Sequence, residues 1–466
     1  MQLDKIKQVY FLGIGGIGMS AIARYFNTLK IPVSGYDKTE TELTKALVNE
    51  GIQIHYKDIG SELANMGYRK ENLLVILTPA IPKNMEELIW FEQNEFTILK
   101  RSQVLGLITD AYKTVGVAGT HGKTTTSTLL AHIFKQSKLD CAAFLGGIST
   151  NYNSNLLLHA NSHINTQEQL MVVEADEFDR SFLTLHPKIG IITSTDADHL
   201  DIYGEHDNLK KSFADYGMQV QEHLFIKKEL SLYNDMLIHH GNNKVKSYSI
   251  IGNADVYANN IHIEGDTYYF DLHTENLSLP KLHLGIPGLH NVENAVAASA
   301  AALVAGVTAE ELRLALASFT GVKRRFEYQI KSPNLVYIDD YAHHPTELSA
   351  TISSVKKMYP NKKISVVFQP HLFTRTRDFV DGFAESLSLA DEVFLLDIYP
   401  ARELPIAGVT SAIIFDKMTL GNKLMCNKNN TLELLAQKQI EVLLTLGAGD
   451  IDTLVESIKQ LLLSKN

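Results

Sequence analysis

The sequence predicts an α/β protein of three domains, each built on a largely parallel sheet. Short apolar runs of the strand type alternate with helical patterns, glycine-rich loops follow two of these runs, and polar clusters stand where others end. Strands that alternate with helices form parallel sheets with helices on both faces. We expect a Rossmann-like domain over residues 1–110, a central domain with an added β-rich segment over 111–322, and a Rossmann-like domain over 323–466.

Composition limits the classes of function. The chain has 466 residues, 45% of them hydrophobic, and a formal net charge of −10, which argues against nucleic-acid binding. No uninterrupted apolar stretch approaches the length of a membrane span, and no signal-peptide pattern opens the chain. Cys141 and Cys426 stand far apart without metal-ligand spacing. We therefore expect a cytoplasmic protein that is not inserted in a membrane.

The first domain opens with a strand at 8–13 and a helix at 17–29, followed by strands at 31–36 and 72–77. The loop between the first strand and the helix is Gly13-Ile14-Gly15-Gly16-Ile17-Gly18, and Asp37 ends the next strand. This is the dinucleotide fingerprint, in which the acid binds a ribose hydroxyl. Any diphosphate uses the same N–H geometry, so the loop predicts a nucleotide and leaves open which one.

The central domain opens with a phosphate loop. The strand 114–118 leads into Gly119–Thr126, a Gly-Lys-Thr turn that begins a helix. Backbone N–H groups face the anion in such a turn, Lys123 reaches the outer phosphates, and the Thr124 hydroxyl can bind Mg²⁺. The general pattern has glycine where this chain has Val117, and the tighter spacing uses Gly119 and Gly122. The loop predicts that the chain uses ATP.

Two acidic clusters follow the next buried strands of this domain. Glu174-Ala175-Asp176-Glu177 ends the strand 170–173, and a segment with Asp196, Asp198, His199 and Asp201 follows the strand 189–193. Strand ends are where a doubly wound sheet binds its ligand. Carboxylates and an imidazole beside a phosphate loop predict a Mg²⁺ site that bridges phosphate oxygens.

The rest of the central domain changes character. Residues 245–285 alternate in polarity, with Glu264-Gly265-Asp266-Thr267 as a hairpin turn, and an Ala-rich helix follows over 291–305. Asn291 at its start is compatible with adenine recognition or with helix capping.

The third domain has strands at 335–338, 364–368, 393–396 and 442–446, with a helix from Pro345. Asp339–Pro345 and Gln369–Arg377 follow the first two of these strands. An arginine there can bind a small carboxylate through two hydrogen bonds, and a neutral histidine can accept a proton. This placement favours functional roles for His343, His371 and Arg375.

Taken in this order, the motifs resemble those of the Mur ligases of bacterial cell-wall synthesis over essentially the whole chain. The most specific are Gly13–Ser20, Gly119–Thr126, 196–201, Gly288–Asn294, Asp339–Pro345 and Gln369–Thr376. The second glycine pair of the first motif, with Met19 and Ser20, favours the ligase that acts first in the pathway. The carbamylated lysine of the later ligases has no identifiable counterpart here.

The resemblance implies a reaction, its substrates and its cofactors. The lactyl carboxylate of UDP-N-acetylmuramate would attack the γ-phosphate of ATP to form an acyl phosphate, and the amine of L-alanine would then displace phosphate. The protein would contribute positioning and charge neutralisation rather than a nucleophile. The first domain would bind the UDP-sugar, the second ATP with two Mg²⁺ ions, and the third the amino acid. We expect a monomer or weak dimer.

The resemblance also implies site residues. The UDP-sugar would be bound by Gly13, Gly15, Gly16, Ile17, Gly18, Met19, Ser20, Asp37, Thr78 and His121. ATP would be bound by Gly119, Thr120, His121, Gly122, Lys123, Thr124, Thr125, Asn291, Asn294, Arg325 and Asp340. The amino acid would be bound by Tyr341, His343, His371 and Arg375. The metal ligands would be Thr124, Glu174 and His199, and the catalytic residues Lys123, Glu174, His199 and His343.

Three positions depart from the family pattern. Many relatives have arginine where this chain has Leu372, so recognition of the amino-acid carboxylate would depend on Arg375. Many also have small residues in place of Phe178 and Arg180, inside the segment that begins at Glu174.

Three other functions are compatible with parts of the pattern. A relative within the family joins a ready-made peptide to the same nucleotide sugar and would need a roomier pocket. An NAD-dependent oxidoreductase would use the first glycine motif but leaves the phosphate loop and acidic clusters unexplained. A nucleotide-sensing regulator would bind ATP and UDP-sugar without turnover.

Overall fold

A computed structural model of the protein describes residues 6–160, 168–196, 203, 205–241, 243–401 and 403–465. The chain divides into two compact units. Unit 1 comprises Met1–Ser249, Asn253–Tyr257 and Val296–Ala315, and unit 2 comprises Ile250–Gly252, Ala258–Ala295 and Leu316–Asn466. Unit 1 thus holds the predicted first domain together with most of the predicted central domain. The boundaries at 110/111 and 322/323 stay predictions.

The first sheet of unit 1 is parallel, with strand order β3-β2-β1-β4-β5. Its strands are β1 (Gln8–Leu12), β2 (Val33–Tyr36), β3 (Gln53–His55), β4 (Leu73–Leu77) and β5 (Thr97–Lys100). The helices between and after them are α1 (Ile17–Thr28), α2 (Glu42–Asn49), α3 (Glu86–Gln93) and α4 (Arg101–Thr109), with a 3₁₀ helix at Gly60–Met66.

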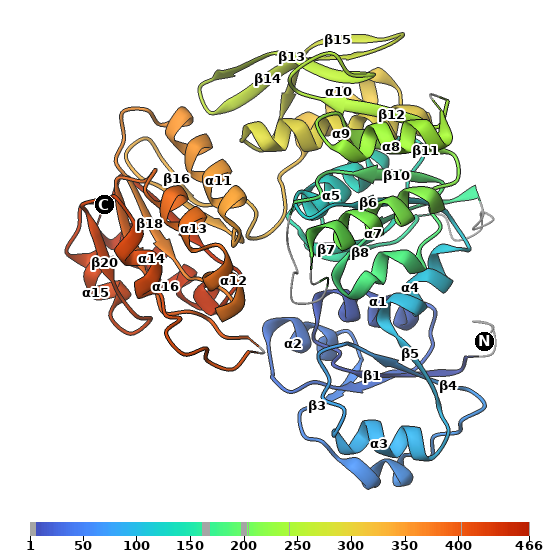
Figure 1. Cartoon of the computed structure of the whole chain (residues 1–466). Helices are drawn as coiled ribbons and strands as arrows, with labels where there is room; N and C mark the ends of the chain where they lie inside the picture. Colours follow the sequence, from blue (N-terminus) through green and yellow to red (C-terminus); the bar gives the residue numbers. More distant parts are fainter. Residues whose placement is uncertain are drawn as a thin grey trace. The chain divides into compact units, whose positions relative to one another are not determined.

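Alternating side chains of β1 bury the two faces of this sheet under different helices. Val9 and Phe11 belong to a cluster with Phe26 of α1, whereas Tyr10 belongs to a cluster with Phe91 of α3. Figure 1 shows α1 and α3 on opposite sides of the sheet. Successive side chains of a strand point to opposite faces, which is why an uninterrupted apolar strand requires a helix on each side.

Helix α1 also packs against the central sheet of unit 1. The rings of Tyr25 in α1 and Phe144 in β7 (Ala142–Ser149) lie with centroids 5.6 Å apart. Asn155 in β8 (Ser154–Leu157) is fully buried, and its amide donates to the Ile17 carbonyl at 2.6 Å. One helix therefore joins the cores of both sheets.

The central sheet in unit 1 has the strand order β12-β11-β10-β6-β9-β7-β8, and β8 is antiparallel to β7. Its further strands are β6 (Lys113–Ala118), β9 (Leu170–Glu174), β10 (Ile189–Ile192), β11 (His223–Lys227) and β12 (Val245–Ser249). The helices are α5 (Lys123–Lys135), α7 (His206–Gln219) and α8 (Ser231–His240), with a 3₁₀ helix at Phe178–Thr184. Strand β6 lies between β9 and β10, so the three carboxyl ends are adjacent. This arrangement brings the phosphate loop and the first acidic cluster to one edge.

Three strands continue from β12 and form the predicted β-rich segment: β13 (Val256–Glu264), β14 (Thr267–Thr274) and β15 (Ser278–Leu284). The predicted turn at Glu264-Gly265-Asp266-Thr267 is confirmed, since β13 ends at Glu264 and β14 begins at Thr267. Helices α9 (Leu289–Ala305) and α10 (Ala309–Ser318) follow, and each contributes residues to both units.

The last sheet lies in unit 2, with strand order β16-β17-β21-β18-β19-β20 and only β16 antiparallel to its neighbour among the described strands. The strands are β16 (Glu327–Lys331), β17 (Val336–Asp340), β18 (Ile364–Phe368), β19 (Glu392–Leu395), β20 (Lys423–Met425) and β21 (Val442–Leu446). The helices are α11 (Pro345–Met358), α12 (Phe373–Asp378), α13 (Val380–Leu387), α14 (Ala412–Lys417), α15 (Thr431–Ala436) and α16 (Val455–Lys465), with a 3₁₀ helix at Asp450–Leu454.

The predicted α/β class with largely parallel sheets is confirmed. Strands β17, β21 and β18 are buried along their whole length and end side by side, so the segments that follow them meet at one edge. Nowhere in the described ranges does a helix combine the length and apolar character needed to cross a membrane.

Candidate active site

The phosphate loop of unit 1 depends on two glycines. Gly119 (φ +138) and Gly122 (φ +81) flank the turn between β6 and α5, in a backbone region that side chains disfavour. A Cβ on Gly119 would lie 2.0 Å from Thr193 Oγ1. Glycine is therefore required here both for the backbone angle and for the close approach of β10.

Strand β10 holds the loop through hydrogen bonds to the residues that follow it. Ser194 Oγ lies 2.9 Å from Thr120 Oγ1 and accepts from the His121 backbone N–H at 2.7 Å. The N–H of Asp196 donates to Thr120 Oγ1 at 3.0 Å, and His121 Nε2 lies 3.5 Å from Asp196 Oδ2. The start of the second acidic segment thus contacts the loop, whereas its predicted ligand His199 lies outside the described residues.

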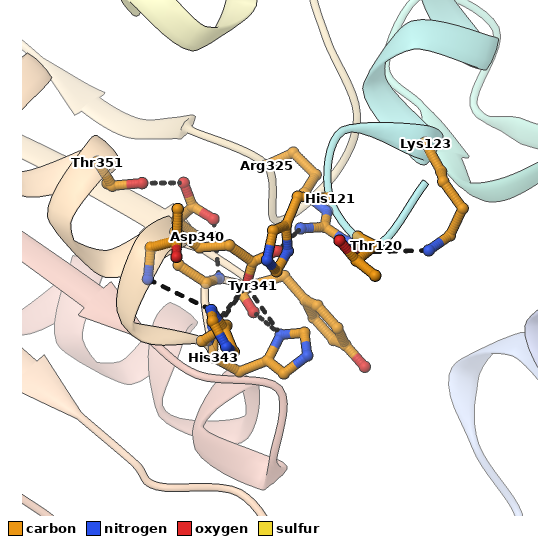
Figure 2. Close-up of polar contacts among 12 residues, drawn as sticks. Thr120, His121, Lys123, Arg325, Asp340, Tyr341, His343 and Thr351 are labelled. Carbon is orange, nitrogen blue, oxygen red and sulfur yellow. Dashed lines mark hydrogen bonds and ion pairs between the residues drawn. The ribbon is translucent and has the colours of Figure 1, made fainter. Parts of the chain in front are cut away.

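Lys123 points back onto its own loop (Figure 2). Its ammonium donates to the Gly119 carbonyl at 2.6 Å and lies 2.7 Å from Glu177 Oε2. Burial lowers the pKa of Lys123, but the carboxylates of Glu177, Glu174 and Asp176 outweigh this effect and leave the pKa above its usual value. Lys123 is therefore a cation, which suits a side chain that binds phosphate.

The oxygen donors predicted for Mg²⁺ lie on the two elements beside this loop. Glu174 ends β9 and is paired in register with Val117, the residue two before Gly119, and Thr124 lies in the first turn of α5. Among the described residues, no three His, Cys, Asp or Glu side chains are grouped as a metal centre. Mg²⁺ is usually held by one or two carboxylates with phosphate oxygens and water, so this donor set fits the ion.

The predicted UDP-sugar loop lies at the start of α1. The backbone N–H of Gly15 donates to Asp37 Oδ2 at 2.7 Å, and Gly13 has a φ of +88°. Helix α1 has no side-chain cap and no acidic residue in its first turn, which leaves its positive end available to an anion. The Thr78 methyl lies against Gly13.

Met19 and Ser20, the other predicted residues of this loop, are buried in the packing of α1. The Ser20 hydroxyl donates to the Ile17 carbonyl at 2.8 Å and accepts from the Asn155 amide at 3.1 Å. Met19 is 1% exposed and belongs to the core cluster that the first and central sheets share. Their positions indicate that they hold the start of the helix in place.

Sequence reasoning missed Arg101, at the start of α4. One guanidinium nitrogen lies 2.8 Å from the position that a Cβ on Gly18 would occupy, and another lies 3.1 Å from Asp176 Oδ2. The guanidinium thus stands between the first glycine loop and the first acidic cluster. Arg101 directly follows β5, a strand that the sequence analysis did not predict, so its place at a strand end could not be recognised.

In unit 2, Asp340 ends β17 as a buried carboxylate (Figure 2). It accepts hydrogen bonds from the Ala342 N–H at 2.9 Å and the Thr351 hydroxyl at 3.0 Å. Burial raises the pKa of Asp340 to about 6, although the charge of Arg325 opposes this shift. The Arg325 guanidinium lies 5.0 Å from the centre of the Tyr341 ring.

The predicted amino-acid residues partly gather at the ends of β17 and β18. The ring of His343 lies 5.3 Å from that of Tyr341 and 6.1 Å from that of His371. The His343 N–H donates to Glu347 Oε2 at 2.9 Å. Arg375 lies in α12 and is 7% exposed.

Glu347 and Tyr399 were not anticipated for this cluster. The carboxylate of Glu347 lies 3.6 Å from the Arg325 guanidinium, and the ring of Tyr399 stacks on that of His371 at 5.8 Å. Glu347 lies in the first turn of α11, where its carboxylate caps the helix. Tyr399 follows β19, outside the motifs that the sequence analysis singled out.

Asn291 and Asn294 lie near the start of α9, in unit 2. The Asn291 amide donates to the Pro287 carbonyl at 2.5 Å, and Asn294 donates to Asn291 Oδ1 at 3.4 Å. Desolvation lowers the pKa of the neighbouring His290 to about 4; the charge of Arg325 supports this shift and that of Glu347 opposes it. Asn291 therefore has a structural contact, and its neighbour His290 lies close to Arg325 and Glu347.

The three departures from the family pattern have structural partners. Leu372 is buried with a φ of +68° and donates its N–H to the Tyr399 carbonyl at 2.9 Å. Phe178 donates its N–H to Asp176 Oδ1 at 3.1 Å, and the Arg180 guanidinium lies 5.5 Å from the centre of the Tyr203 ring.

Comparison with protein families matches three domains in order along the chain. The Mur ligase family, catalytic domain, matches residues 8–113, the Mur ligase middle domain matches 117–302, and the Mur ligase, glutamate ligase domain, matches 324–451. Together they account for most of the sequence, including both glycine loops.

Individual proteins match over their whole length. The UDP-N-acetylmuramate–L-alanine ligase of Flavobacterium johnsoniae is 49% identical to this chain over 464 residues, 99% of each protein. The crystal structure of the UDP-N-acetylmuramate–alanine ligase of Thermotoga maritima has a TM-score of 0.80 and 27% identity, covering 98% of this chain and 100% of that one. A murein peptide ligase from Psychrobacter arcticus, at 21% identity and a TM-score of 0.71 over 98% of this chain, shares the fold.

Proposed function

The chain belongs to the Mur ligase family, and from this premise we infer that it joins L-alanine to the lactyl carboxylate of UDP-N-acetylmuramate in an ATP-dependent reaction of peptidoglycan synthesis. The observation that carries this function is the full-length similarity to ligases of that name, at 49% identity in one of them. The first glycine loop falls within the family's own catalytic domain, which removes the main argument for an NAD-dependent oxidoreductase.

The chemistry explains the need for a phosphate loop. A carboxylate is a poor acyl donor because its oxygen is a poor leaving group. Transfer of the γ-phosphoryl group of ATP to that oxygen releases ADP and gives an acyl phosphate. The amine of L-alanine then attacks the carbonyl carbon to form the C–N bond and gives up a proton. The bond from that carbon to the phosphorylated oxygen breaks, and phosphate leaves with this oxygen and the electron pair.

Lys123 carries the largest share of the first step in this proposal. Its ammonium neutralises the charge that spreads over the transferring phosphoryl group, while the loop N–H groups and α5 hold the β-phosphate. His121, fixed by β10 through Ser194, lies on the loop where the sugar carboxylate approaches. No side chain of the protein forms a covalent bond with the substrate.

Magnesium is the metal that the donor set suits. Thr124 and Glu174 would hold one ion, and Glu174 with His199 a second, where the metal would neutralise phosphate charge. The protein itself keeps Glu174 in place, because the carboxylate packs against Gly146, where a Cβ would lie 2.0 Å from Glu174 Oε2.

Two regions would bind the remaining parts of the substrates. In unit 1, the loop from Gly13 to Ser20 would bind the UDP diphosphate, with Asp37 on the ribose and Thr78 beside the loop. In unit 2, Asn291 and Asn294 would bind adenine, Arg325 the phosphates, and Asp340 the ATP ribose. There, His343 and the other residues predicted to bind the amino acid would shape its site; these are Tyr341, His371 and Arg375.

The setting of the reaction is also a proposal. The described cysteines, Cys141 and Cys426, are free and buried, which suits a reducing compartment such as the cytoplasm. The substrates are small molecules, and the net charge of −10 gives no basis for nucleic-acid binding. A monomer or weak dimer is the simplest assembly for such a site.

The test is phosphate release from ATP with Mg²⁺ and UDP-N-acetylmuramate, with and without L-alanine. The function predicts release that requires both substrates and a UDP-muramoyl-alanine product by mass spectrometry. Turnover with an L-alanyl-γ-D-glutamyl tripeptide but not with L-alanine would instead support the peptide-joining relative. ATP binding without turnover on either substrate would support a nucleotide sensor.

A further inference from the structure

The ammonium of Lys123 is fully engaged by acceptors of the protein itself. It donates to the Gly119 carbonyl at 2.6 Å and lies 2.9 Å from Glu177 Oε1 and 2.7 Å from Glu177 Oε2. The Thr120 carbonyl lies further off, at 3.5 Å. An ammonium group has three protons to donate, so a phosphate oxygen that binds Lys123 must replace one of these acceptors.

Glu177 is held in place by burial and by hydrogen bonds to its backbone, so it cannot move with the Lys123 side chain. Its side chain is 1% exposed, and its backbone carbonyl accepts hydrogen bonds from the Tyr203 hydroxyl at 2.6 Å and the Arg180 N–H at 2.9 Å. The residue also directly precedes the 3₁₀ helix Phe178–Thr184. Since backbone and carboxylate are both enclosed, the carboxylate has a fixed position relative to β9.

We propose that Glu177 is a positioning residue that holds Lys123 back on the loop, so that nucleotide phosphates must compete with this carboxylate for the ammonium. The proposal rests on the proposed function in one respect, the use of ATP at this loop. It goes beyond that function by making Glu177 the residue that limits how tightly the loop binds nucleotide and thereby favours release of ADP.

The physical basis is the burial of the pair. Charges removed from water attract each other strongly, and a carboxylate that loses its cation inside a protein is left unfavourably placed. Binding of phosphate to Lys123 therefore weakens the contact between Lys123 and Glu177. A neutral side chain of the same shape at position 177 would relieve this competition and leave the full charge of Lys123 to the phosphates.

The experiment is calorimetric titration of the full chain with ADP, in the absence and presence of Mg²⁺, for the wild type and for Glu177→Gln. We expect Glu177→Gln to bind ADP about tenfold more tightly, the low end of coupling between close buried charges. Asp179→Asn is the matched control, because Asp179 is an exposed acid of the same segment that pairs with Lys100. The control should bind ADP as the wild type does.

Steady-state kinetics separate positioning from a merely structural role. With ADP held more tightly and Lys123 less well oriented, Glu177→Gln should lower both the KM for ATP and kcat, and Glu177→Asp should restore part of kcat. A Glu177→Gln protein that folds but binds ADP no more tightly than the wild type would overturn the proposal. ADP binding requires neither UDP-sugar nor L-alanine, so a wild type without alanine-dependent turnover would refute the proposed function and not this inference.

A second comparison decides the matter if Glu177→Gln alone does not fold. Lys123→Met leaves the Glu177 carboxylate without the ammonium, and Lys123→Met/Glu177→Gln removes both charges. The proposal expects the double variant to unfold at a higher temperature than Lys123→Met. A double variant that unfolds at the same or a lower temperature, or does not fold, would show that Glu177 has a separate structural role and would overturn the proposal.

Discussion

The two glycine loops of unit 1 have the same strand–glycine–helix arrangement, but side chains of opposite charge contact their backbones. Each joins a buried parallel strand to a helix through a glycine with positive φ, Gly13 in the first loop and Gly119 in the second. In the first loop a carboxylate accepts a backbone N–H, from Gly15 to Asp37. In the second an ammonium donates to a backbone carbonyl, from Lys123 to Gly119.

This difference indicates which ligand each loop can select. The strand–glycine–helix turn provides N–H donors and a positive helix end in both cases, so it selects for phosphate in general. The side chain beside the turn adds selectivity. Asp37 brings a negative acceptor suited to ribose hydroxyls, whereas Lys123 brings a cation suited to the charge of a triphosphate.

Removing the cation from the second loop should have the largest effect. Lys123→Ala is expected to reduce ligation by about 10²–10³-fold, because a preorganised charge at the transferring phosphoryl group is lost. Binding of UDP-N-acetylmuramate, measured by calorimetry, should stay within about twofold because the first loop is intact. Full activity in this variant would refute the proposed mechanism.

The next largest effect is expected when one methyl group is added to each loop, because the two loops should lose different amounts of stability. Gly119→Ala places a Cβ 2.0 Å from Thr193 Oγ1 at a φ of +138°, and we expect a loss of about 3 kcal/mol or more in the free energy of unfolding. Gly18→Ala places a Cβ against the flexible Arg101 side chain, whose nearest atom would lie at 2.8 Å, and should cost less than about 1 kcal/mol. Urea denaturation measures both, and equal losses would contradict the distinction.

A third carboxylate at a strand end, Asp340, accepts hydrogen bonds from neutral donors only, and burial raises its pKa. Burial raises its pKa to about 6 from an ordinary 3.8, so between these pH values the folded state binds more protons than the unfolded state. Its contribution to the free energy of unfolding therefore rises as the pH falls through 6. Below pH 3.8 this contribution reaches its full value of about 3 kcal/mol.

The measurement is the difference between the wild type and Asp340→Asn in urea denaturation from pH 4 to pH 8. The variant should gain relative stability towards pH 8 and lose it towards pH 4. His290, whose pKa burial lowers to about 4, favours the opposite trend in the whole protein, but it is present in both and cancels in the difference. A difference that does not vary with pH would show that Asp340 has an ordinary pKa.

A small effect on substrate binding is expected for the acid of the first loop. Asp37→Asn keeps an oxygen that can accept the Gly15 N–H but removes the charge that would bind ribose hydroxyls. Binding of UDP-N-acetylmuramate should weaken by about tenfold, as for the loss of one hydrogen bond to a charged group. ADP affinity, measured on the same protein, should not change, and a shared loss would mean that the variant disturbs the fold.

The sequence was sufficient for most elements because each is a local pattern. The apolar runs at 364–368 and 442–446 correspond to β18 and β21 without a shift, since strands buried on both faces have unbroken apolar sequences. The helix predicted from Asn291 begins at Leu289, two residues earlier, because capping signals set helix ends only approximately.

The pairings inside the site were beyond the sequence. Glu177 was one of four residues in an acidic cluster, and nothing local distinguishes it from Glu174. It meets Lys123 only because β9 lies beside β6, a neighbour relation between segments far apart in the chain. Arg101 meets Gly18 within the first domain and Asp176 of the central sheet, and both contacts join segments far apart in the chain. Glycine motifs identify the loops from the sequence. Which side chains contact the loops depends on how distant segments pack together.

Helix α1 has a consequence for how the protein is made. Its Tyr25 packs on Phe144 and the carbonyl of Ile17 is held by Asn155, both from the β7–β8 hairpin. A ribosome delivers the whole first sheet before it has begun that hairpin. The face of α1 that packs on this hairpin therefore stays uncovered until residues 142–157 emerge, and a chain cut near residue 110 would remain in that incomplete, association-prone state.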